Sequence, residues 1–409
     1  MCECGVQMER IGEEVSEKLD IIPAKMQVVR HVRYKYACKN CEGVESDGPT
    51  VKIAPTPAQI IPKGIATPGL LAHILTSKFE DALPFYRQEK IFARLGVEIP
   101  RPTMCGWAMK VAEQCEPLLS LLHQEIRSGP LINMDETPVQ VMNEPGRSNT
   151  STSYMWVFRG GVPDKPVLMY QYHPTRSGQV PGNFLKGYKG YIQTDGYNGY
   201  DALSRRPGIY HVGCWAHVRR KFMEVTKAAS GDGKKGHADK ALEYIGKLYA
   251  VEKSARGQKL KVDQIVAVRR EHSAPVLAEF KTWLESLAGQ TPPKGLLGKA
   301  VNYALKNWPS LVRYLENGHI TPDNNAAENA IRPFVLGRKN WLFAGHPNGA
   351  HASAALFSLI ETAKANGLEP YAYLRCLFEQ LPIVKDQAGY RALLPQYIDR
   401  ELITRSARN

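Results

Sequence analysis

Apolar and polar positions follow two different periods along this chain, and the changes of period divide it into segments. Between residues 66 and 128, apolar side chains recur at three- and four-residue spacing, which predicts helices. From about residue 130, the runs PLINMDETPVQVM, SYMWVFRG and KPVLMYQYH are short, rich in β-branched and aromatic residues, and separated by turn residues, which predicts strands. A helix over residues 177–186 and the strands YIQTDGY and GIYHVGCW are expected to follow. This order predicts an α/β core with a mixed sheet.

Strand character disappears after residue 215. The apolar residues of two later stretches each fall on one helical face: Leu242, Ile245, Leu248 and Tyr249 in the first, and Val276, Phe280, Trp283, Leu284 and Leu287 in the second. We therefore expect an all-helical insertion, after which TPDNNAAENAIRPFVLGRKN returns the chain to the α/β core.

Together these patterns predict the following domain organisation. We expect a small N-terminal module over residues 1–45, a proline-containing linker over 46–65, a helical region over 66–128, the first part of the α/β core over 129–214, the helical insertion over 215–318, the last part of the core over 319–350, and a C-terminal helical element over 351–409.

The helical region contains a turn punctuated by glycine and proline, GVEIPRPTMCGWAMKVAEQ, in which Thr103 is the expected N-cap of the next helix. Two helices joined by a short turn in a basic protein are compatible with a helix-turn-helix DNA-binding unit. A plain helical hairpin fits the pattern equally well.

The chain is strongly basic, because Lys+Arg 53 against Asp+Glu 40 gives a net charge of +13 and a pI of about 9.2. This excess attracts polyanions, since neutralising phosphates releases condensed counterions. Charge alone does not separate DNA from RNA or from an anionic membrane. No apolar run is long enough to span a bilayer, and the first residues lack the apolar core of a signal peptide. We therefore expect no membrane partner and a cytoplasmic location.

Of the 8 cysteines, four fall in two close pairs, Cys2 with Cys4 and Cys38 with Cys41. Thiols stay reduced in the cytoplasm, so metal binding is a better explanation of these pairs than disulfides. The intervening run AKMQVVRHVRYKYAC predicts a strand or hairpin. Zinc would stabilise a module that is too small to fold on its own core.

Three carboxylates are the candidates for chemistry. Asp135 follows the apolar run LINM and Asp195 follows YIQT, so each is expected at a strand end, where carboxylates of neighbouring strands converge. Glu328 lies in NNAAENAIR, where Asn324 or Asn325 can cap a helix and place Glu328 in its first turn. Oxygen ligands of this kind suit Mg²⁺, and two such ions can activate a water or a 3′-hydroxyl and stabilise the leaving oxygen.

Each acid also has an ordinary structural explanation, as a turn former or as a partner of the helix dipole. The neighbouring Glu136 could compete with Asp135, but strand alternation would point it to the opposite face.

The chain resembles the insertion sequence 66 family of bacterial transposases over nearly its whole length. The resemblance lies in MDETPV around Asp135, QTDGYNGY around Asp195, GCWAHVRRKF, DNNAAENAIRPFVLGRKNWLFAG around Glu328, and the tail SLIETAKANGLEPYAYLRCLFEQLP. It implies an RNase H-like core with an Asp-Asp-Glu triad, in which Asp135, Asp195 and Glu328 hold two Mg²⁺ ions, with Mn²⁺ as an alternative. It also implies structural Zn²⁺ on Cys2, Cys4, Cys38 and Cys41.

Cys214 and His217 match a Cys-x-x-His element found after the second aspartate in several transposase groups. Two ligands do not complete a zinc site, so we expect these residues to support the core or the catalytic carboxylates rather than bind metal.

Basic residues near these motifs are the expected DNA contacts, which position a duplex without identifying its sequence. They are Arg30, Arg33 and Lys35 in the N-terminal module, Arg219, Arg220 and Lys221 after GCWAH, and Arg332, Arg338 and Lys339 after Glu328. Arg332 could also orient the Glu328 carboxylate. For each of these residues, a solvated surface position is the alternative.

The resemblance implies a transposase that cleaves DNA at the ends of its element and joins the freed 3′-hydroxyls to target DNA. A homo-oligomer on the DNA is expected, and accessory proteins of the element are further expected partners. The alternatives are a nuclease or resolvase on the same fold, and an inactive or truncated copy that acts only as a zinc-containing DNA-binding protein. Truncation is considered because family members usually carry a longer segment before the cysteines.

Overall fold

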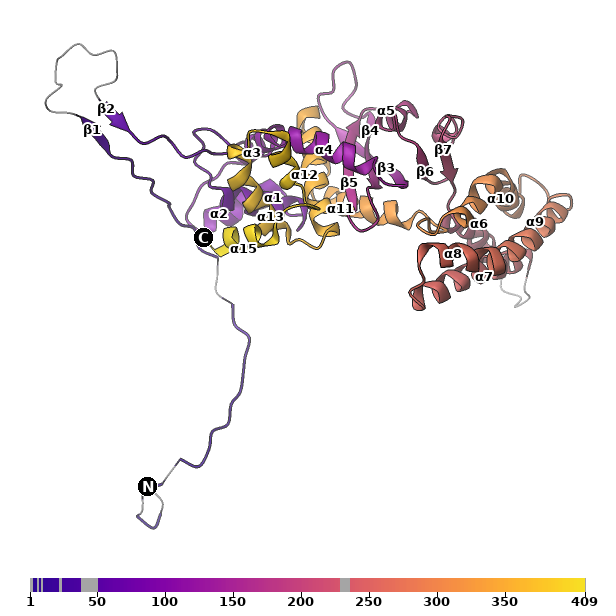
Figure 1. Ribbon diagram of the computed structural model, residues 1–409, viewed down its shortest axis with the longest axis horizontal. Coiled ribbons are helices and arrows are strands. Elements are labelled where there is room, and N and C mark those ends of the chain that lie inside the picture. Colours follow the sequence, from indigo (N-terminus) through magenta and orange to yellow (C-terminus); the bar gives the residue numbers. More distant parts are fainter. Residues whose placement is uncertain are drawn as a thin grey trace. The chain divides into compact units, whose positions relative to one another are not determined.

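The computed structural model describes residues 3–5, 7, 8, 10–21, 24–37, 51–228 and 236–408 (Figure 1). The chain divides into two compact units. The first comprises Met1–Thr56 with Lys90–Glu98, and the second comprises Pro57–Glu89 with Ile99–Asn409.

In the first unit, β1 (Lys35–Ala37) pairs antiparallel with β2 (Val51–Ile53). Arg33 Nη1 donates a hydrogen bond to the Ala54 carbonyl over 2.9 Å and extends this pairing by one step. The strand expected before Cys38 is present. Within the stretch 46–65, where the sequence predicts a linker, the residues VKI form β2, a short strand that pairs with β1.

The sheet of the second unit is mixed, as the sequence predicts, with the strand order β5-β4-β3-β6-β7 and β8 pairing with β3. The strands are β3 (Leu131–Val141), β4 (Thr152–Gly160), β5 (Val167–His173), β6 (Gly190–Gln193), β7 (Ile209–Val212) and β8 (Phe343–Ala344). The pairs β3–β4 and β4–β5 are antiparallel, whereas β3–β6, β6–β7 and β3–β8 are parallel. The expected helix between β5 and β6 is α5 (Gln179–Phe184).

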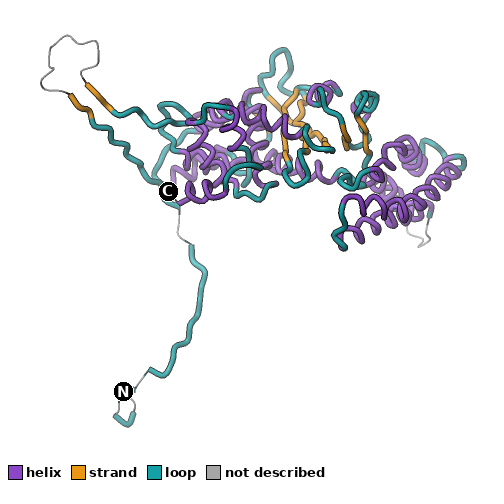
Figure 2. Tube along the Cα trace, in the orientation of Figure 1, coloured by secondary structure: helices purple, strands orange, loops and turns teal. Residues whose placement is uncertain are grey.

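Helices precede and follow the strands of this sheet in the chain, and Figure 2 shows helices in purple and strands in orange. Those before it are α1 (Pro68–Phe79), α2 (Phe85–Arg94), α3 (Arg101–Gln114) and α4 (Glu116–Ile126); those after the insertion are α11 (Asn325–Trp341), α12 (Pro347–Ala365), α13 (Pro370–Gln380), α14 (Gln387–Ala392) and α15 (Arg400–Arg408). Thr103 is not the N-cap of α3, as the sequence suggested, because Pro102 suits a first helical turn and the helix already begins at Arg101.

The edge strand β5 is covered by α12 (Figure 1). The Ser358 hydroxyl accepts a hydrogen bond from the Tyr170 backbone N–H over 2.8 Å. The Thr362 hydroxyl accepts from the Leu168 N–H over 3.0 Å and donates to the Leu168 carbonyl over 2.9 Å. These side chains satisfy backbone groups of Leu168 and Tyr170, so α12 protects this part of the edge strand.

The predicted helical insertion consists of α6 (Trp215–Ala228), α7 (His237–Gly257), α8 (Val262–Val268), α9 (Ala274–Ala288) and α10 (Leu296–Leu311). Its core gathers the apolar faces expected from the sequence, and Ile245, Leu248 and Phe280 are completely buried. Arg269 is also buried, where it pairs with both oxygens of Glu252 at 2.7 Å and donates to the carbonyls of the segment that returns to the sheet. Through these contacts, Arg269 joins α7, which carries Glu252, to the segment that leads back to the sheet.

No helix among the described residues has the length and apolar character that a membrane span requires.

Candidate active site

Asp135 and Asp195 occupy matching positions relative to two neighbouring parallel strands. Asp195 comes two residues after the end of β6, as expected. The strand end expected at Asp135 is wrong, because antiparallel pairing with β4 continues β3 past this residue to Val141. Asn133 on β3 is the register partner of Gln193 on β6, and each aspartate follows its partner by two residues. Side chains two residues apart on an extended backbone share a face, so the two carboxylates project from the same side of the sheet. The structure thus brings these two predicted site residues together on one side of the sheet, at the level where the shorter strand β6 ends.

A network of buried amides holds this arrangement. The Asn133 side chain donates to Gln193 Oε1 over 2.9 Å and to Asn324 Oδ1 over 3.1 Å. Asn324 in turn donates to the Met134 carbonyl over 2.9 Å, and Gln193 donates to the Thr321 carbonyl over 2.7 Å. Asn133 and Gln193 are not among the site residues that the sequence predicts. A feature of the sequence that indicates them is an amide side chain directly after two apolar or aromatic residues in each strand, Asn133 in LIN and Gln193 in YIQ.

Glu328 enters the site from the first turn of α11, as expected. Asn324 occupies the N-cap position of this helix, but its side chain makes no capping hydrogen bond, so the predicted capping role is wrong for Asn324. The side chain is instead committed to β3, as described above. The consequence is that the amino end of α11 is tied directly to the strand that carries Asp135.

The three carboxylates line one cavity of about 300 Å³. The cavity is bounded by Asp135, Asp195, His217, Arg220, Asn324, Glu328, Ile331, Arg332 and Val335. From α11, the residues Glu328, Ile331, Arg332 and Val335 all contribute because positions separated by three, four and seven residues lie on one helical face. The site therefore combines an acidic floor with basic side chains at its wall.

The acidic floor changes the ionisation of Asp135. Burial, reinforced by repulsion from Glu136, Asp195 and Glu328, raises the pKa of Asp135 to about 7. A backbone hydrogen bond of 2.9 Å from the Glu136 N–H to Asp135 Oδ1 opposes this shift only in part. Several carboxylates crowded into a buried space are a site that a cation would stabilise.

Glu136 does not line this cavity. Its buried carboxylate pairs with Arg176 and accepts a hydrogen bond from the Tyr200 hydroxyl. Arg176 also lies over the ring of Tyr197, with its guanidinium carbon 3.8 Å from the ring centroid. Glu136 therefore anchors the segment that follows Asp195 rather than contributing a ligand.

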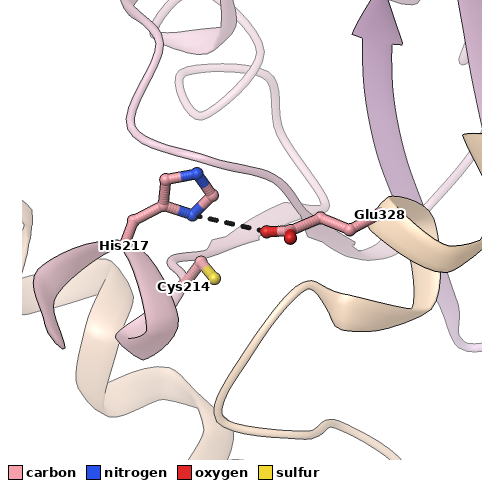
Figure 3. Close-up of side chains that lie close together, drawn as sticks. All are labelled: Cys214, His217 and Glu328. Carbon is pink, nitrogen blue, oxygen red and sulfur yellow. Dashed lines mark ion pairs between the residues drawn. The ribbon is translucent and has the colours of Figure 1, made fainter. Parts of the chain in front are cut away.

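Glu328 faces α6 with its carboxylate, as Figure 3 shows. Its Oε1 lies 3.8 Å from His217 Nδ1, and its Oε2 lies 3.7 Å from Arg220 Nη2. The Cys214 sulfur accepts a hydrogen bond from the Asn324 backbone N–H over 3.2 Å. Among the described residues, one ligand atom each from Cys214, His217 and Glu328 lie within 4.8 Å of one another, and the two aspartates are outside this group.

The helical insertion contributes to the site through α10. A Cβ on Gly196, the residue after Asp195, would lie 2.3 Å from the Tyr303 hydroxyl oxygen, so only glycine allows this approach. Lys221 of α6 lies over the same tyrosine ring, with Nζ 4.7 Å from its centroid. The position of Asp195 thus depends on the packing of the insertion.

The predicted DNA contacts do not all lie at the cavity. Arg220 and Arg332 line it and are exposed, and Lys339 lies further along the exposed face of α11. Arg338 is half-buried, and its Nη1 donates to the Thr137 hydroxyl over 3.4 Å, while burial lowers its pKa. Arg219 is exposed on α6, beside Arg220.

The N-terminal residues belong to the first unit. Arg30, Arg33 and Lys35 are exposed there, the last of them on β1. Cys4 is an exposed free thiol. The other predicted zinc ligands, Cys2, Cys38 and Cys41, lie outside the described residues.

Comparison with known protein families gives matches along almost the whole chain. A model described as the transposase IS66 family matches residues 63–352. A model of the zinc-finger binding domain of transposase IS66 matches residues 1–42, and a model of the IS66 C-terminal element matches residues 358–396.

Similar proteins occur in Sinorhizobium fredii (strain NBRC 101917 / NGR234). The uncharacterized protein y4jD is 35% identical over 391 residues, which cover 92% of this chain and 74% of that protein. The uncharacterized protein y4qI is 32% identical over 405 residues, covering 96% of this chain and 72% of that protein. These relatives carry no assigned activity in their names.

Proposed function

Because the chain belongs to the IS66 family of transposases, we propose that it cleaves DNA at the ends of its mobile element and joins the freed 3′-hydroxyls to target DNA. Family membership implies an enzyme that processes nucleic acid. The observation that carries the more specific proposal is that Asp135 and Asp195, each two residues after the register pair Asn133–Gln193 of β3 and β6, share one cavity with Glu328.

We assign the core to the RNase H-like fold. Support comes from the sheet, in which three antiparallel strands, β5-β4-β3, are continued by the parallel strands β6 and β7. The acid-bearing helix α11 packs on β3 and β4. On this basis we retain the proposed division into core parts over 129–214 and 319–350, separated by the insertion over 215–318 and flanked by the segments 1–45, 46–65, 66–128 and 351–409.

The residues at the cavity fit a pair of Mg²⁺ ions. They offer carboxylate oxygens, which Mg²⁺ prefers, and their mutual repulsion is expressed in the raised pKa of Asp135. Asp135, Asp195 and Glu328 would hold the ions, and Mn²⁺ would be an alternative. When bound, the ions supply Lewis-acid stabilisation of the attacking and leaving oxygens and lower the pKa of a bound water.

The chain's own residues position the substrate. The buried amides fix the two aspartates, and the ion pair with Arg220 restrains Glu328 on the opposite wall. Arg220 and Arg332 would contact the phosphates that flank the scissile bond, since both cations line the cavity. Lys339, seven residues after Arg332 and on the same face of α11, would extend this contact along the DNA backbone. Arg219, Lys221 and Arg338 are proposed as supporting contacts.

The N-terminal segment is proposed to bind Zn²⁺ through Cys2, Cys4, Cys38 and Cys41, in agreement with the zinc-finger match to residues 1–42. Its Arg30, Arg33 and Lys35 are proposed to bind the element ends. Transposition joins two ends, so we propose that a homo-oligomer assembles on DNA in the cytoplasm, with accessory proteins of the element as further partners.

The proposal is tested with the full chain, Mg²⁺ and labelled DNA that carries the borders of its own element. The wild type is compared with Asp195→Asn and with Asp201→Asn, a matched exposed aspartate six residues away. We expect cleavage and joining to be lost in the first variant and retained in the second. Cleavage without joining of a pre-cut end would indicate a nuclease or resolvase, and binding without cleavage by the wild type would indicate a DNA-binding protein without catalysis.

A further inference from the structure

Two polar atoms at the cavity face each other without a hydrogen-bond partner. His217 Nδ1 and Glu328 Oε1 are both buried, and neither makes a hydrogen bond. They lie 3.8 Å apart, which is too far for a hydrogen bond and wide enough for a metal ion coordinated by both atoms. A buried polar atom without a hydrogen-bond partner destabilises the folded state, so a cation bound between these two atoms would remove that cost.

Cys214 adds a third ligand to this pair. Cys214 directly precedes α6, and His217 lies in the first turn of that helix. The side chains of both residues therefore lie near the Glu328 carboxylate (Figure 3). The sulfur accepts a backbone hydrogen bond from Asn324, a contact that suits a thiolate held for coordination. One ligand atom from each of Cys214, His217 and Glu328 lie within 4.8 Å of one another.

We propose that Cys214, His217 and Glu328 form a binding site for a thiophilic divalent transition-metal ion, with Zn²⁺ as the expected occupant. A thiolate, an imidazole and a carboxylate are the ligand types that zinc accepts, whereas Mg²⁺ avoids sulfur and nitrogen. Three protein ligands leave a fourth coordination position open. Two of the three ligands, His217 and Glu328, line the cavity shared with Asp135 and Asp195. This site differs both from the N-terminal cysteine module and from the proposed magnesium pair.

Occupation of this site would control the reaction, an inference that rests on the proposed function. Glu328 belongs to both ligand sets. Zinc bound to Oε1 would hold this carboxylate toward α6, where Oε2 also lies 3.7 Å from Arg220, and would draw it away from ions between the aspartates. Zinc would therefore act as an inhibitor that competes with Mg²⁺ for Glu328.

The binding claim is tested without any activity measurement. The full-length wild type, Cys214→Ser and Cys105→Ser are titrated with Co²⁺, and the thiolate-to-cobalt absorption band and the bound equivalents are recorded. The N-terminal cysteines are the same in all three proteins, so the difference between wild type and Cys214→Ser isolates the proposed site. Cys105→Ser removes a free thiol of α3 outside the cluster and serves as the matched control.

We expect Cys214→Ser to bind about one equivalent less than wild type, because loss of a direct ligand should exceed the roughly 10–100-fold affinity loss caused by removing a supporting residue. Cys105→Ser should match the wild type. If wild type and Cys214→Ser bound the same number of Co²⁺ equivalents and gave superimposable absorption bands, the proposed metal site would be wrong. Should Cys214→Ser fail to fold, as judged by circular dichroism, His217→Gln replaces it with the same expected loss, because His217 is partly exposed and tolerates substitution better.

The regulatory claim needs a second measurement. Zn²⁺ added to the Mg²⁺-dependent cleavage reaction should inhibit the wild type, and excess Mg²⁺ should relieve the inhibition. If zinc bound without inhibiting cleavage, the proposed competition between Zn²⁺ and Mg²⁺ for Glu328 would be wrong, and the proposed metal site itself would still hold. Absence of cleavage by the wild type would instead count against the proposed function, whereas the cobalt titration would still decide the metal site.

Discussion

The side-chain amide of Asn133 donates a hydrogen bond of 2.9 Å to Gln193 across the parallel pair β3–β6, two residues before Asp135 on one strand and two residues before Asp195 on the other. This contact therefore sets the separation of the two aspartates. The same amide reaches Asn324 at the start of α11, so one buried side chain links all three elements that carry the proposed catalytic acids.

Replacing Asn133 by leucine is predicted to destabilise the protein by roughly 2–4 kcal/mol, because Gln193 and Asn324 would each keep a buried acceptor without its donor. Gln140→Leu on the same strand is the control, since its amide is exposed and should change the free energy of unfolding by no more than about 0.5 kcal/mol. Urea denaturation of both variants checks this. Equal stability of the two would contradict the role of the amide network.

Asp135→Asn is predicted to stabilise the Mg²⁺-free protein at alkaline pH. The pKa of Asp135 is raised to about 7 in the folded state, against about 3.9 for an unfolded aspartate. The native state thus keeps a proton that the unfolded state releases, and the free energy of unfolding of the wild type falls as pH rises through this window. The Asp135→Asn variant has no carboxyl group at this position to titrate, so its free energy of unfolding does not fall for this reason.

The advantage of Asp135→Asn should therefore be near zero below about pH 4 and should level off at roughly 1–3 kcal/mol above about pH 7. Urea denaturation across this range measures it. An advantage that is the same at every pH would show that the carboxyl is not perturbed by its surroundings.

Substitution of Arg332 or Lys339 by glutamine is predicted to weaken DNA binding uniformly over different sequences and to lower the salt slope of the binding constant by about 1 each. Both residues lie on the exposed face of α11. Lys281→Gln on α9 removes the same charge from the insertion and is the control. If all three variants behaved alike, net charge and not a defined DNA path would explain binding.

Arg269→Met is predicted to destabilise the insertion by about 3–5 kcal/mol, because Glu252 would remain buried without its cation. The neighbouring Arg270 is exposed, so Arg270→Met should have little effect. Thermal unfolding followed by circular dichroism distinguishes the two. If Arg269→Met left the thermal stability unchanged, water or another side chain would have to replace the guanidinium as the partner of Glu252.

Local pattern explains what the sequence could predict. Apolar residues precede Asp135 and Asp195 within or next to a strand, and the helices of the insertion carry regular apolar faces, so both kinds of element are determined by neighbouring residues. The same holds for Glu328, which lies three residues beyond the N-terminus of its helix. The full length of β3, which continues past Asp135, depends instead on its pairing with β4.

Long-range contacts explain what the sequence could not predict. The pairing of Asn133 with Asn324 joins residues 191 positions apart, and no local pattern reports it. The approach of His217 to Glu328 depends on how the insertion orients α6. Likewise, β2 is short and lies within a proline-containing stretch. Only its pairing with β1 makes it a strand.

The most direct test of the central claim is a metal-specificity switch at Asp195. A thiolate binds Mn²⁺ better than Mg²⁺, so Asp195→Cys should lose cleavage of element ends in Mg²⁺ and recover it in Mn²⁺, whereas the wild type should cleave in both. Recovery in Mn²⁺ alone would establish Asp195 as a metal ligand of the reaction. Cleavage by Asp195→Cys in Mg²⁺ at the wild-type rate would contradict the account, because the aspartate would then have no part in holding the metal ions.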